Sequence, residues 1–266
     1  MLAAAELDAT GVCVVRGACE ERTCASCLTE ILSATERMLT LPAPISEASA
    51  AGTRHFVPIV PSSAAPKRME HRRDFKLPLS PCVEAVLRAA LSGGAGAVLL
   101  EYLGRDAELF ELTAITSTPG AAAQEMHSDG MWSATGARQV TMFIALHDID
   151  ERMGPTQFCP STHHPRCFPS ERWLPPSEAL VSERGGGTCF EMRAGDAVLM
   201  DSLTWHSGGA NTSDRRRTLL SATFEEDRAR DSRSAATAKQ PPAVLPRRGA
   251  QSLPRLGELM DGTHAS

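Results

Sequence analysis

The spacing of hydrophobic residues over the first hundred positions predicts a short strand and two amphipathic helices. Residues 11–15 form a β-branched run that is typical of a strand. One helix is expected from Glu20 to Leu39, and a second one ends at Gly93-Gly94. The apolar positions at helical spacing are Cys24, Leu28, Ile31 and Met38 in the first helix and Val83, Val86, Leu87, Ala90 and Leu91 in the second. Residues 40–66, which are rich in Pro, Ala and Ser, are interpreted as a long loop or lid.

Beyond about residue 105 the period changes from helical to alternating. The positions expected to share a face are Phe110, Leu112, Ala114 and Thr116 in one segment and Val140, Met142, Ile144 and Leu146 in the next, where Thr141 and Phe143 lie on the opposite face. Residues 188–192, 197–200 and 219–224 are also strand-like. Short strands without helical crossovers predict a mainly β fold with flanking helices, as a β-sandwich or a double-stranded jelly roll.

We expect one domain over residues 1–227, with a helical front (1–105) and a jelly-roll core (106–227). After Asp227 the composition turns to Arg, Ala, Ser and Pro. This composition predicts a loosely ordered C-terminal tail over residues 228–266.

Charge and composition narrow the classes of partner. The 266 residues carry 27 basic and 32 acidic side chains, for a net charge of −5, which does not favour nucleic-acid binding. The chain has no apolar run of about 18 residues, so no membrane span is expected. The acidic N-terminus does not resemble an export signal, so we expect an intracellular, cytoplasmic protein.

Eight cysteines raise the question of disulfides or zinc. A chain of this length without an export signal favours reduced thiols. Cys24 and Cys27 have the C-x-x-C spacing of zinc sites, but no second pair stands at a matching separation. Both fall within the first predicted helix, so we interpret them as part of its buried face.

A candidate metal site begins at His127-Ser-Asp129. Residues i and i+2 of an extended chain point to the same side, so this imidazole and carboxylate can reach one ion. His206 follows a turn and the apolar run 197–200, and it is the candidate third ligand. Two histidines and one carboxylate are the facial triad of non-haem Fe(II) oxygenases. His147 and the pair His163-His164 compete, but they are interpreted as a strand end and a turn.

Basic residues flank this constellation. Arg217 stands directly before the strand-like run from Leu219, so its guanidinium is expected to point inward, where it could clamp a dicarboxylate. Arg215 and Arg216 are interpreted as a solvated turn. A further basic group, Arg68, Arg72 and Arg73, could meet an anionic substrate, but a solvated face is the commoner explanation of such a run.

These motifs together resemble the phytanoyl-CoA dioxygenase family of Fe(II)/2-oxoglutarate oxygenases. The resemblance runs from about Gly11 to Phe224. It includes residues 11–17, 103–109, the metal motif, the Gly154-Pro-Thr stretch and Pro160-Ser-Thr-His163. The distal His206 and Arg217 keep the family's spacing of eleven (217 − 206 = 11).

The resemblance implies a double-stranded β-helix (a cupin-like jelly roll) that holds Fe(II) with His127, Asp129 and His206. It further implies that 2-oxoglutarate is held by Arg217, with Gln124, Thr141 and Phe143 near it, and that O2 is the oxidant. For Phe143, core packing is the alternative role. Trp132 is a candidate wall of the substrate pocket, or else a half-buried packing aromatic.

Two positions depart from the family pattern. Ser161 stands where relatives have the glycine of a Pro-Gly-Ser-His turn, which would alter that turn. Gly208 stands where many relatives have a serine or threonine. One hydrogen bond to 2-oxoglutarate is then absent or comes from another residue, for example Ser207.

The expected activity is that of a 2-oxoglutarate-dependent dioxygenase, hydroxylating an unactivated C–H bond of a small molecule with release of succinate and CO2. The alternative is a jelly-roll metal-binding protein that keeps the triad without catalysis, or that uses zinc in the same ligand set. Arg217 discriminates between them, because a zinc hydrolase needs no dicarboxylate clamp. The family accepts acyl-CoA thioesters, compatible solutes, alkaloids and other metabolites, so the substrate stays open.

Overall fold

The computed structural model describes residues 2–39, 71–129, 137–164, 178–183, 187–227 and 254–263. Its helices are α1 (Leu2–Thr10), α2 (Glu21–Leu39), α4 (Pro81–Leu91), α5 (Gly94–Leu103), η1 (Glu151–Met153), α6 (Glu178–Glu183) and α8 (Leu256–Asp261). Its strands are β1 (Val12–Val15), β2 (Arg72–Lys76), β3 (Glu108–Ser117), β4 (Gln139–Ala145), β5 (Thr156–Phe158), β6 (Thr188–Cys189), β7 (Ala197–Asp201), β8 (His206–Gly208) and β9 (Arg217–Glu225).

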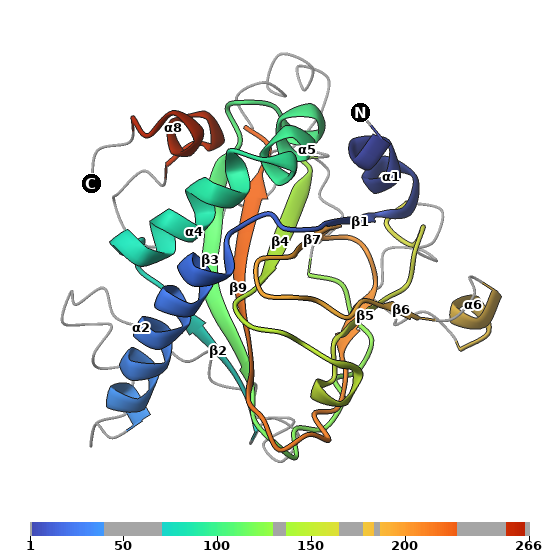
Figure 1. Cartoon of the computed structure of the whole chain (residues 1–266). Coiled ribbons are helices and arrows are strands. Elements are labelled where there is room, and N and C mark those ends of the chain that lie inside the picture. Colours follow the sequence, from blue (N-terminus) through green and yellow to red (C-terminus); the bar gives the residue numbers. More distant parts are fainter. Residues whose placement is uncertain are drawn as a thin grey trace, which may run out of the picture.

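The strands form two antiparallel sheets. The larger sheet has the order β1-β7-β4-β9-β3-β2, and the smaller one has the order β6-β5-β8. Figure 1 shows α2, α4 and α5 on one side of the larger sheet, with the smaller sheet on the other side. This arrangement is a double-stranded β-helix with flanking helices, as the sequence predicted.

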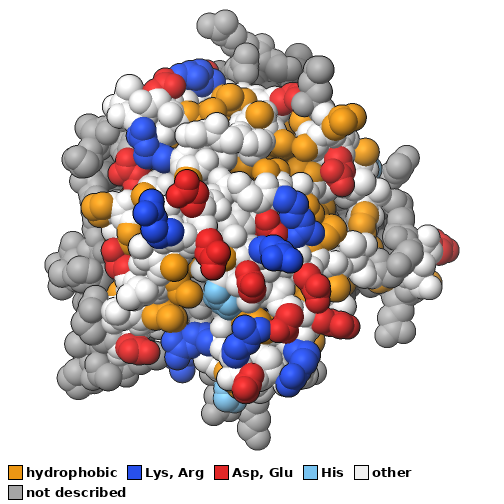
Figure 2. Space-filling view, in the orientation of Figure 1, with side chains coloured by type: hydrophobic (Ala, Val, Ile, Leu, Met, Phe, Trp, Pro, Cys, Tyr) orange, Lys and Arg blue, Asp and Glu red, His pale blue; other side chains and the backbone are white. Residues whose placement is uncertain are grey.

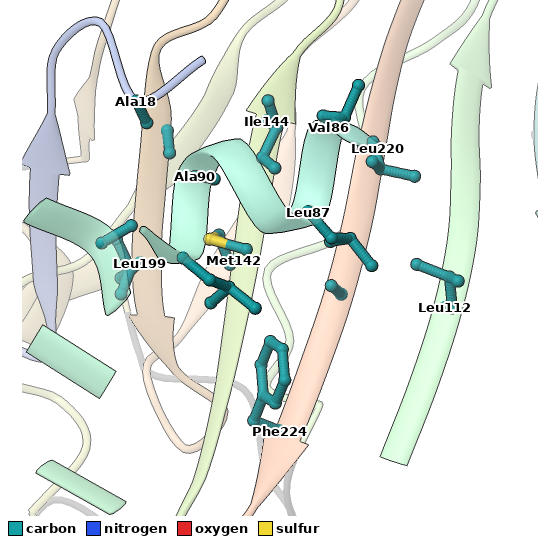
Figure 3. Close-up of a cluster of buried hydrophobic side chains, with 14 of the residues drawn as sticks. Ala18, Val86, Leu87, Ala90, Leu112, Met142, Ile144, Leu199, Leu220 and Phe224 are labelled. Atoms are coloured by element: carbon teal, nitrogen blue, oxygen red, sulfur yellow. The ribbon is translucent and has the colours of Figure 1, made fainter. Parts of the chain in front are cut away.

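Side chains on the two faces of the larger sheet enter two different cores. Met142 and Ile144 of β4 pack in the cluster shared with α4 and α5, part of which Figure 3 draws. Phe143 and Ala145 of the same strand belong to a second cluster, together with Phe158 of the smaller sheet. The predicted alternation of β4 is therefore confirmed, because successive side chains of a strand point to opposite faces.

The prediction that Phe110 shares a face with Leu112, Ala114 and Thr116 was wrong. The register between β3 and β9 shifts between Leu109 and Glu111, so Phe110 is an extra residue with no partner on β9. Its side chain is 46% exposed, whereas Leu109 and Leu112 on either side are buried. A bulge of this kind depends on the partner strand, so the alternation of β3 alone does not reveal it.

The helices α2 and α4 confirm the two predicted helices, but Gly93-Gly94 does not end the helical front. Helix α4 ends at Leu91, and α5 starts at Gly94 at an angle of 77° to it. A side chain at Gly96 would lie 1.8 Å from the carbonyl oxygen of Leu91, so glycine is needed for this close approach. Cys24 and Cys27 are fully buried on α2, as expected of thiols on the buried face of a helix.

Part of the C-terminal tail is ordered, contrary to the prediction. The backbone of residues 254–256 pairs with β3 and the turn before it, since Leu109 N donates to Pro254 O at 3.0 Å and Leu256 N donates to Ala107 O at 2.7 Å. Leu256 and Leu259 of α8 are fully buried. Two leucines on one face of a short helix are enough to attach it to the core. Residues 228–253 and the predicted loop 40–66 lie outside the described residues.

No single helix of the described chain is long and apolar enough to cross a membrane; α4 and α5 meet that criterion only as a bent pair. On the face drawn in Figure 2, acidic and basic side chains are interspersed, without a broad patch of one sign. This surface agrees with the small net charge of −5.

Candidate metal centre

The three predicted metal ligands lie together. His127 and His206 form an isolated antiparallel bridge, with His127 N donating to His206 O at 2.9 Å and His206 N donating to His127 O at 2.7 Å. Asp129 N donates to Ser202 O at 3.0 Å, and this bond holds the Asp129 carboxylate on the same side as the two imidazoles. One potential ligand atom from each of the three residues lies within 4.8 Å of the others. Such a cluster can hold one metal ion.

Hydrogen bonds set the tautomer of both imidazoles. His127 Nδ1 lies 2.8 Å from Glu125 O, and His206 Nδ1 lies 3.0 Å from Thr204 O. A carbonyl only accepts hydrogen bonds, so each Nδ1 carries the proton and each Nε2 keeps its lone pair for a metal. Burial, the largest effect, lowers the pKa of His206 below its usual value. Both features favour the neutral imidazole that binds metal.

The centre is closed on one side and open on the other. The His206 side chain is 6% exposed and stacks on Phe158, with ring centroids 6.4 Å apart. The Asp129 side chain is 44% exposed. Three protein ligands on one side leave coordination positions free on the open side, as a catalytic metal requires and a closed structural site does not.

A second group of polar side chains crosses the sheet beside this centre. Arg72 on β2 pairs with Ser117 on β3, and Ser117 pairs with Arg217 on β9. Residues directly opposite each other in a sheet point to the same face, and neighbouring strands are about 4.8 Å apart. The three side chains therefore form one row across the sheet. Arg217 was predicted to point inward, and it is 1% exposed.

The interpretation of Arg72 as a solvated residue was wrong. Arg72 is 4% exposed, and its Nη2 donates to Ala122 O at 3.1 Å and to Gly209 O at 2.8 Å. A side chain at Gly208 would lie 2.4 Å from Arg72 Nη1. The guanidinium thus lies where the hydroxyl side chain of many relatives would be. The sequence could not indicate this, because Arg72 stands in a basic run and meets Gly208 only through the fold.

Among the described residues, the two arginines have no acidic partner. Within the same part of the chain, five polar atoms of the row are shut off from solvent and have no hydrogen-bond partner: Nε and Nη1 of Arg72, Oγ of Ser117, and Nε and Nη1 of Arg217. Burial, and second the Arg72 guanidinium, lower the pKa of Arg217 to about 9. Buried charges are otherwise paired, so this row fits a bound anion with several acceptor atoms, such as a carboxylate.

Of the remaining predicted cosubstrate residues, Gln124 and Phe143 lie beside this row, whereas Thr141 pairs with Thr223, six residues along β9 from Arg217 (223 − 217 = 6), and lies away from it. Gln124 Oε1 accepts a hydrogen bond from Gly208 N at 2.9 Å, which places its amide beside Arg72. Thr141 Oγ1 lies 2.9 Å from Thr223 Oγ1 and 3.5 Å from Ser202 Oγ, beneath the strand end that holds Asp129. Phe143 packs against Phe158 and lines a cavity that also contacts Arg217. Phe143 thus packs in the second core cluster, and its proximity to 2-oxoglutarate stays a prediction. Trp132 lies outside the described residues.

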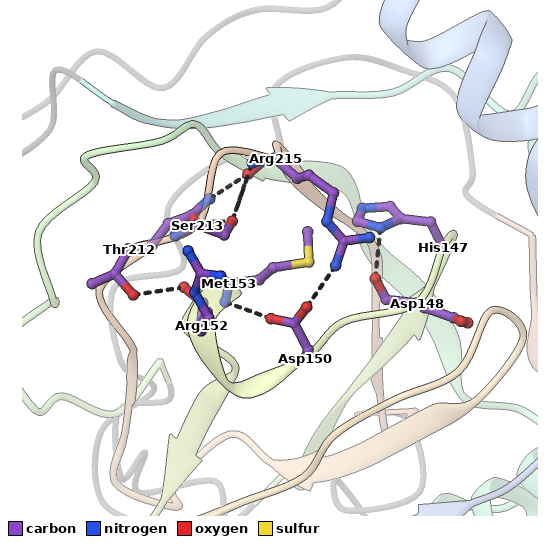
Figure 4. Close-up of polar contacts among 9 residues, drawn as sticks. His147, Asp148, Asp150, Arg152, Met153, Thr212, Ser213 and Arg215 are labelled. Atoms are coloured by element: carbon purple, nitrogen blue, oxygen red, sulfur yellow. Dashed lines mark hydrogen bonds and ion pairs between the residues drawn. The ribbon is translucent and has the colours of Figure 1, made fainter.

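A polar network fixes the turn that leads into Arg217 (Figure 4). His147 Nε2 accepts from Thr218 N at 2.9 Å, and Arg215 pairs with Asp150 at 2.6 Å. Asn211 Nδ2 donates to Arg215 O at 2.8 Å and to Ser117 O at 3.0 Å. His147 is therefore a structural group near the end of β4, as expected, and sequence analysis missed its bond to the strand of Arg217.

The turn at Ser161 keeps the conformation that a glycine would favour. Ser161 has φ +60°, and it is the only non-glycine residue with positive φ in the described chain. Its N donates to Thr10 O at 2.6 Å, and its Oγ donates to Ala9 O at 3.1 Å. These bonds to the end of α1 compensate for the unfavourable backbone of a serine at this position.

Fold and site together define a class: jelly-roll proteins with a mononuclear centre of two histidines and one carboxylate next to a buried anion pocket. The model of the phytanoyl-CoA dioxygenase (PhyH) family matches residues 7–219, most of the chain. The chain therefore belongs to this family.

Three solved structures illustrate the fold. The epimerase SnoN, in complex with Fe3+, alpha-ketoglutarate and nogalamycin RO, has a TM-score of 0.63 and 19% identity over 96% of this chain and 93% of its own. The alpha-ketoglutarate-dependent carbocyclase SnoK has a TM-score of 0.57 and 17% identity over 85% and 83%. HygX from Streptomyces hygroscopicus, with nickel and 2-oxoglutarate bound, has a TM-score of 0.54 and 14% identity over 83% and 84%. At these identities the likeness establishes the fold.

Proposed function

We propose that the protein is an Fe(II)/2-oxoglutarate-dependent oxygenase. One observation carries this proposal: the two-histidine, one-carboxylate centre lies beside two buried arginines that have no acidic partner among the described residues. A metal alone would not require such cations. A metal with a dicarboxylate cosubstrate requires both parts of the site.

The residues present fit both groups. His127 and His206 would bind the iron through Nε2, and Asp129 would bind it through its carboxylate. Arg217 and Arg72 would hold the carboxylate of 2-oxoglutarate that is remote from the metal, since both have free guanidinium N–H groups. The related structure of SnoN supports this assignment, because it was solved with Fe3+ and alpha-ketoglutarate bound.

When bound, Fe(II) and 2-oxoglutarate supply the activation of O2, with oxidative decarboxylation of the keto acid to succinate and CO2. The protein's part is to bind and orient. The carboxylate of Asp129 would offset part of the metal charge, and Phe143 and Phe158 would exclude water from the cosubstrate side. The exposed side of Asp129 leaves room for a small-molecule substrate. We propose hydroxylation of a C–H bond as the outcome, although SnoN is an epimerase and SnoK a carbocyclase.

The alternative functions explain less. A zinc hydrolase or a metal-binding protein without turnover needs the triad. Neither function supplies an anion that would pair with the buried Arg72 and Arg217. An uncompensated buried charge costs several kcal/mol, on the order of the stability of the whole domain. The anion pocket therefore favours the oxygenase.

The test is succinate formation by the purified protein with Fe(II), 2-oxoglutarate and O2, measured with and without candidate substrates. The variant Asp129→Ala should lose both metal binding and turnover, because two histidines alone hold iron weakly. Asp106→Asn removes an exposed carboxylate paired with Arg255 and serves as the matched control. Zinc that is retained through purification, with no succinate from the iron-loaded protein, would contradict the proposal.

A further inference from the structure

The turn between β7 and β8 carries the carbonyl oxygens that hold two of the three metal ligands. Ser202 O accepts the hydrogen bond from Asp129 N at 3.0 Å, and Thr204 O accepts the bond from His206 Nδ1 at 3.0 Å. The first bond places the aspartate on the metal side, and the second one orients the imidazole ring. The position of each ligand therefore depends on how one peptide group of this turn is oriented.

The N–H end of each of these two peptide groups is bonded to a side chain. In the first group, Leu203 N donates to Asp201 Oδ1 at 2.9 Å. In the second group, Trp205 N donates to Thr162 Oγ1 at 2.9 Å. A peptide group is planar, so a bond that fixes its N–H also fixes the direction of its C=O. Each of the two metal ligands is thus connected to a polar side chain through a single peptide group.

Both side chains are buried and held by a further partner. Thr162 is fully buried, and its Oγ1 donates to Cys159 O at 2.7 Å. Asp201 is 5% exposed, and its Oδ2 accepts from the hydroxyl of Tyr102 at 2.9 Å. Neither side chain can rotate away without leaving a buried polar group unpaired. Thr162 also gives a role to the stretch 160–163, which sequence analysis singled out without assigning one.

We propose that Thr162 and Asp201 are positioning residues of the metal centre: Thr162 orients His206, and Asp201 orients Asp129, each through the backbone of the turn. The proposal rests on the metal centre of the oxygenase function proposed above. Loss of an outer partner that orients a metal ligand typically lowers metal affinity by roughly ten- to a hundredfold. These two residues act through a peptide group, so we expect the lower end of that range.

A titration of the metal-free protein with Co(II) tests the proposal without turnover. The visible absorption of bound Co(II) reports both its affinity and the geometry of its ligands. Thr162→Val keeps the shape of the side chain without the hydroxyl, and Asp201→Ala removes the carboxylate. Each should weaken Co(II) binding roughly tenfold and change the spectrum. Thr162→Ser and Asp201→Asn keep the acceptor oxygen, so they should stay within about threefold of the unchanged protein.

Two control variants separate positioning from a general loss of stability. Thr35→Val removes a buried hydroxyl that donates to Ile31 O on α2. Asp196→Ala removes a buried carboxylate that accepts from Gly17 N, next to the opposite end of β7. Both controls should lower Tm, as the test variants do, but should keep the Co(II) affinity within about twofold, because they lie away from the turn.

The proposal is overturned if Thr162→Val and Asp201→Ala bind Co(II) as tightly as the unchanged protein, or if the controls weaken binding as much at an equal loss of Tm. It is also overturned if the Ser and Asn variants bind no better than the Val and Ala variants. Thr162→Val decides the question alone if Asp201→Ala does not fold. In all these cases, Co(II) binding by the unchanged protein leaves the oxygenase function standing, whereas its absence refutes that function as well.

Discussion

Arg72 offers the sharpest test of the anion pocket, because its place in a basic run predicts a solvated side chain, whereas the fold buries it in one row with Arg217. In the variant Arg72→Met, the aliphatic part of the side chain is kept and the guanidinium is lost. Two of its nitrogens, Nε and Nη1, have no partner among the residues that the structure describes and are available to a carboxylate. A hydrogen bond to a charged group contributes about 1.5–3 kcal/mol, so the variant should lose about 2 kcal/mol of 2-oxoglutarate binding, or roughly thirtyfold in Kd.

The protein without cosubstrate should respond much less. Methionine leaves the carbonyls of Ala122 and Gly209 without the Nη2 donor, which costs about 1–3 kcal/mol. It also removes one of two mutually repelling buried cations, which offsets part of that cost. We therefore expect a small change in Tm in the absence of cosubstrate, which separates the loss of binding from a loss of folding.

The assay is isothermal titration with Mn(II) in place of Fe(II), using 2-oxoglutarate and 2-oxopentanoate, which has the same chain without the second carboxylate. Arg72→Met should weaken 2-oxoglutarate by roughly thirtyfold and 2-oxopentanoate by about threefold at most. Arg22→Met removes an arginine whose side chain is 91% exposed and should change neither affinity. Equal losses for the two keto acids, or no loss for 2-oxoglutarate, would refute a contact between Arg72 and the second carboxylate.

Three further variants test other parts of the structure. Gly208→Ser places a Cβ 2.4 Å from Arg72 Nη1, so the guanidinium must move and 2-oxoglutarate affinity should fall roughly tenfold in the same titration; unchanged affinity would contradict the placement of Arg72. Ser161→Val should lower the free energy of unfolding by about 1–3 kcal/mol in urea, because a β-branched residue tolerates φ +60° poorly, whereas Ser161→Gly should stay within about 1 kcal/mol; equal effects of the two changes would argue against strain. Burial raises the pKa of Asp196, but hydrogen bonds from Arg193 N, Arg16 and Gly17 N outweigh it, so the pKa is lowered on folding. The stabilisation by Asp196 is therefore present above the unfolded pKa of about 3.9 and is lost as the pH falls through the folded pKa. Asp196→Asn should lower the free energy of unfolding by about 1–2 kcal/mol at pH 7 and by little at pH 2. A constant difference across that range would contradict the linkage.

Much of the metal centre could be predicted from the chain because its signals are local. The spacing of His127 and Asp129 puts both side chains on one side of an extended segment whatever surrounds it. The alternation of β4 likewise follows from the pleat of a single strand, and it correctly assigned Thr141 and Phe143 to the inner face. The inward direction of the Arg217 side chain was predicted because this residue stands directly before an apolar, strand-like run.

The predictions that were wrong, and the features that were not predicted, depend on contacts between distant segments. The register with β9 decides the bulge at Phe110, and contact with β3 and the turn before it orders the helix at Leu256 in a segment whose composition is that of a tail. The burial of Arg72 depends on contacts with a distant segment, because its Nη2 donates a hydrogen bond to the carbonyl oxygen of Gly208.

The sequence by itself predicted a mainly β protein with a two-histidine, one-carboxylate site, because alternation and i, i+2 spacing act within a few residues. Only the tertiary structure decided what lies around that site. It placed Arg72, Ser117 and Arg217 in one row. Burial and cross-strand register determine which charges remain without partners, and neither can be read along a single strand.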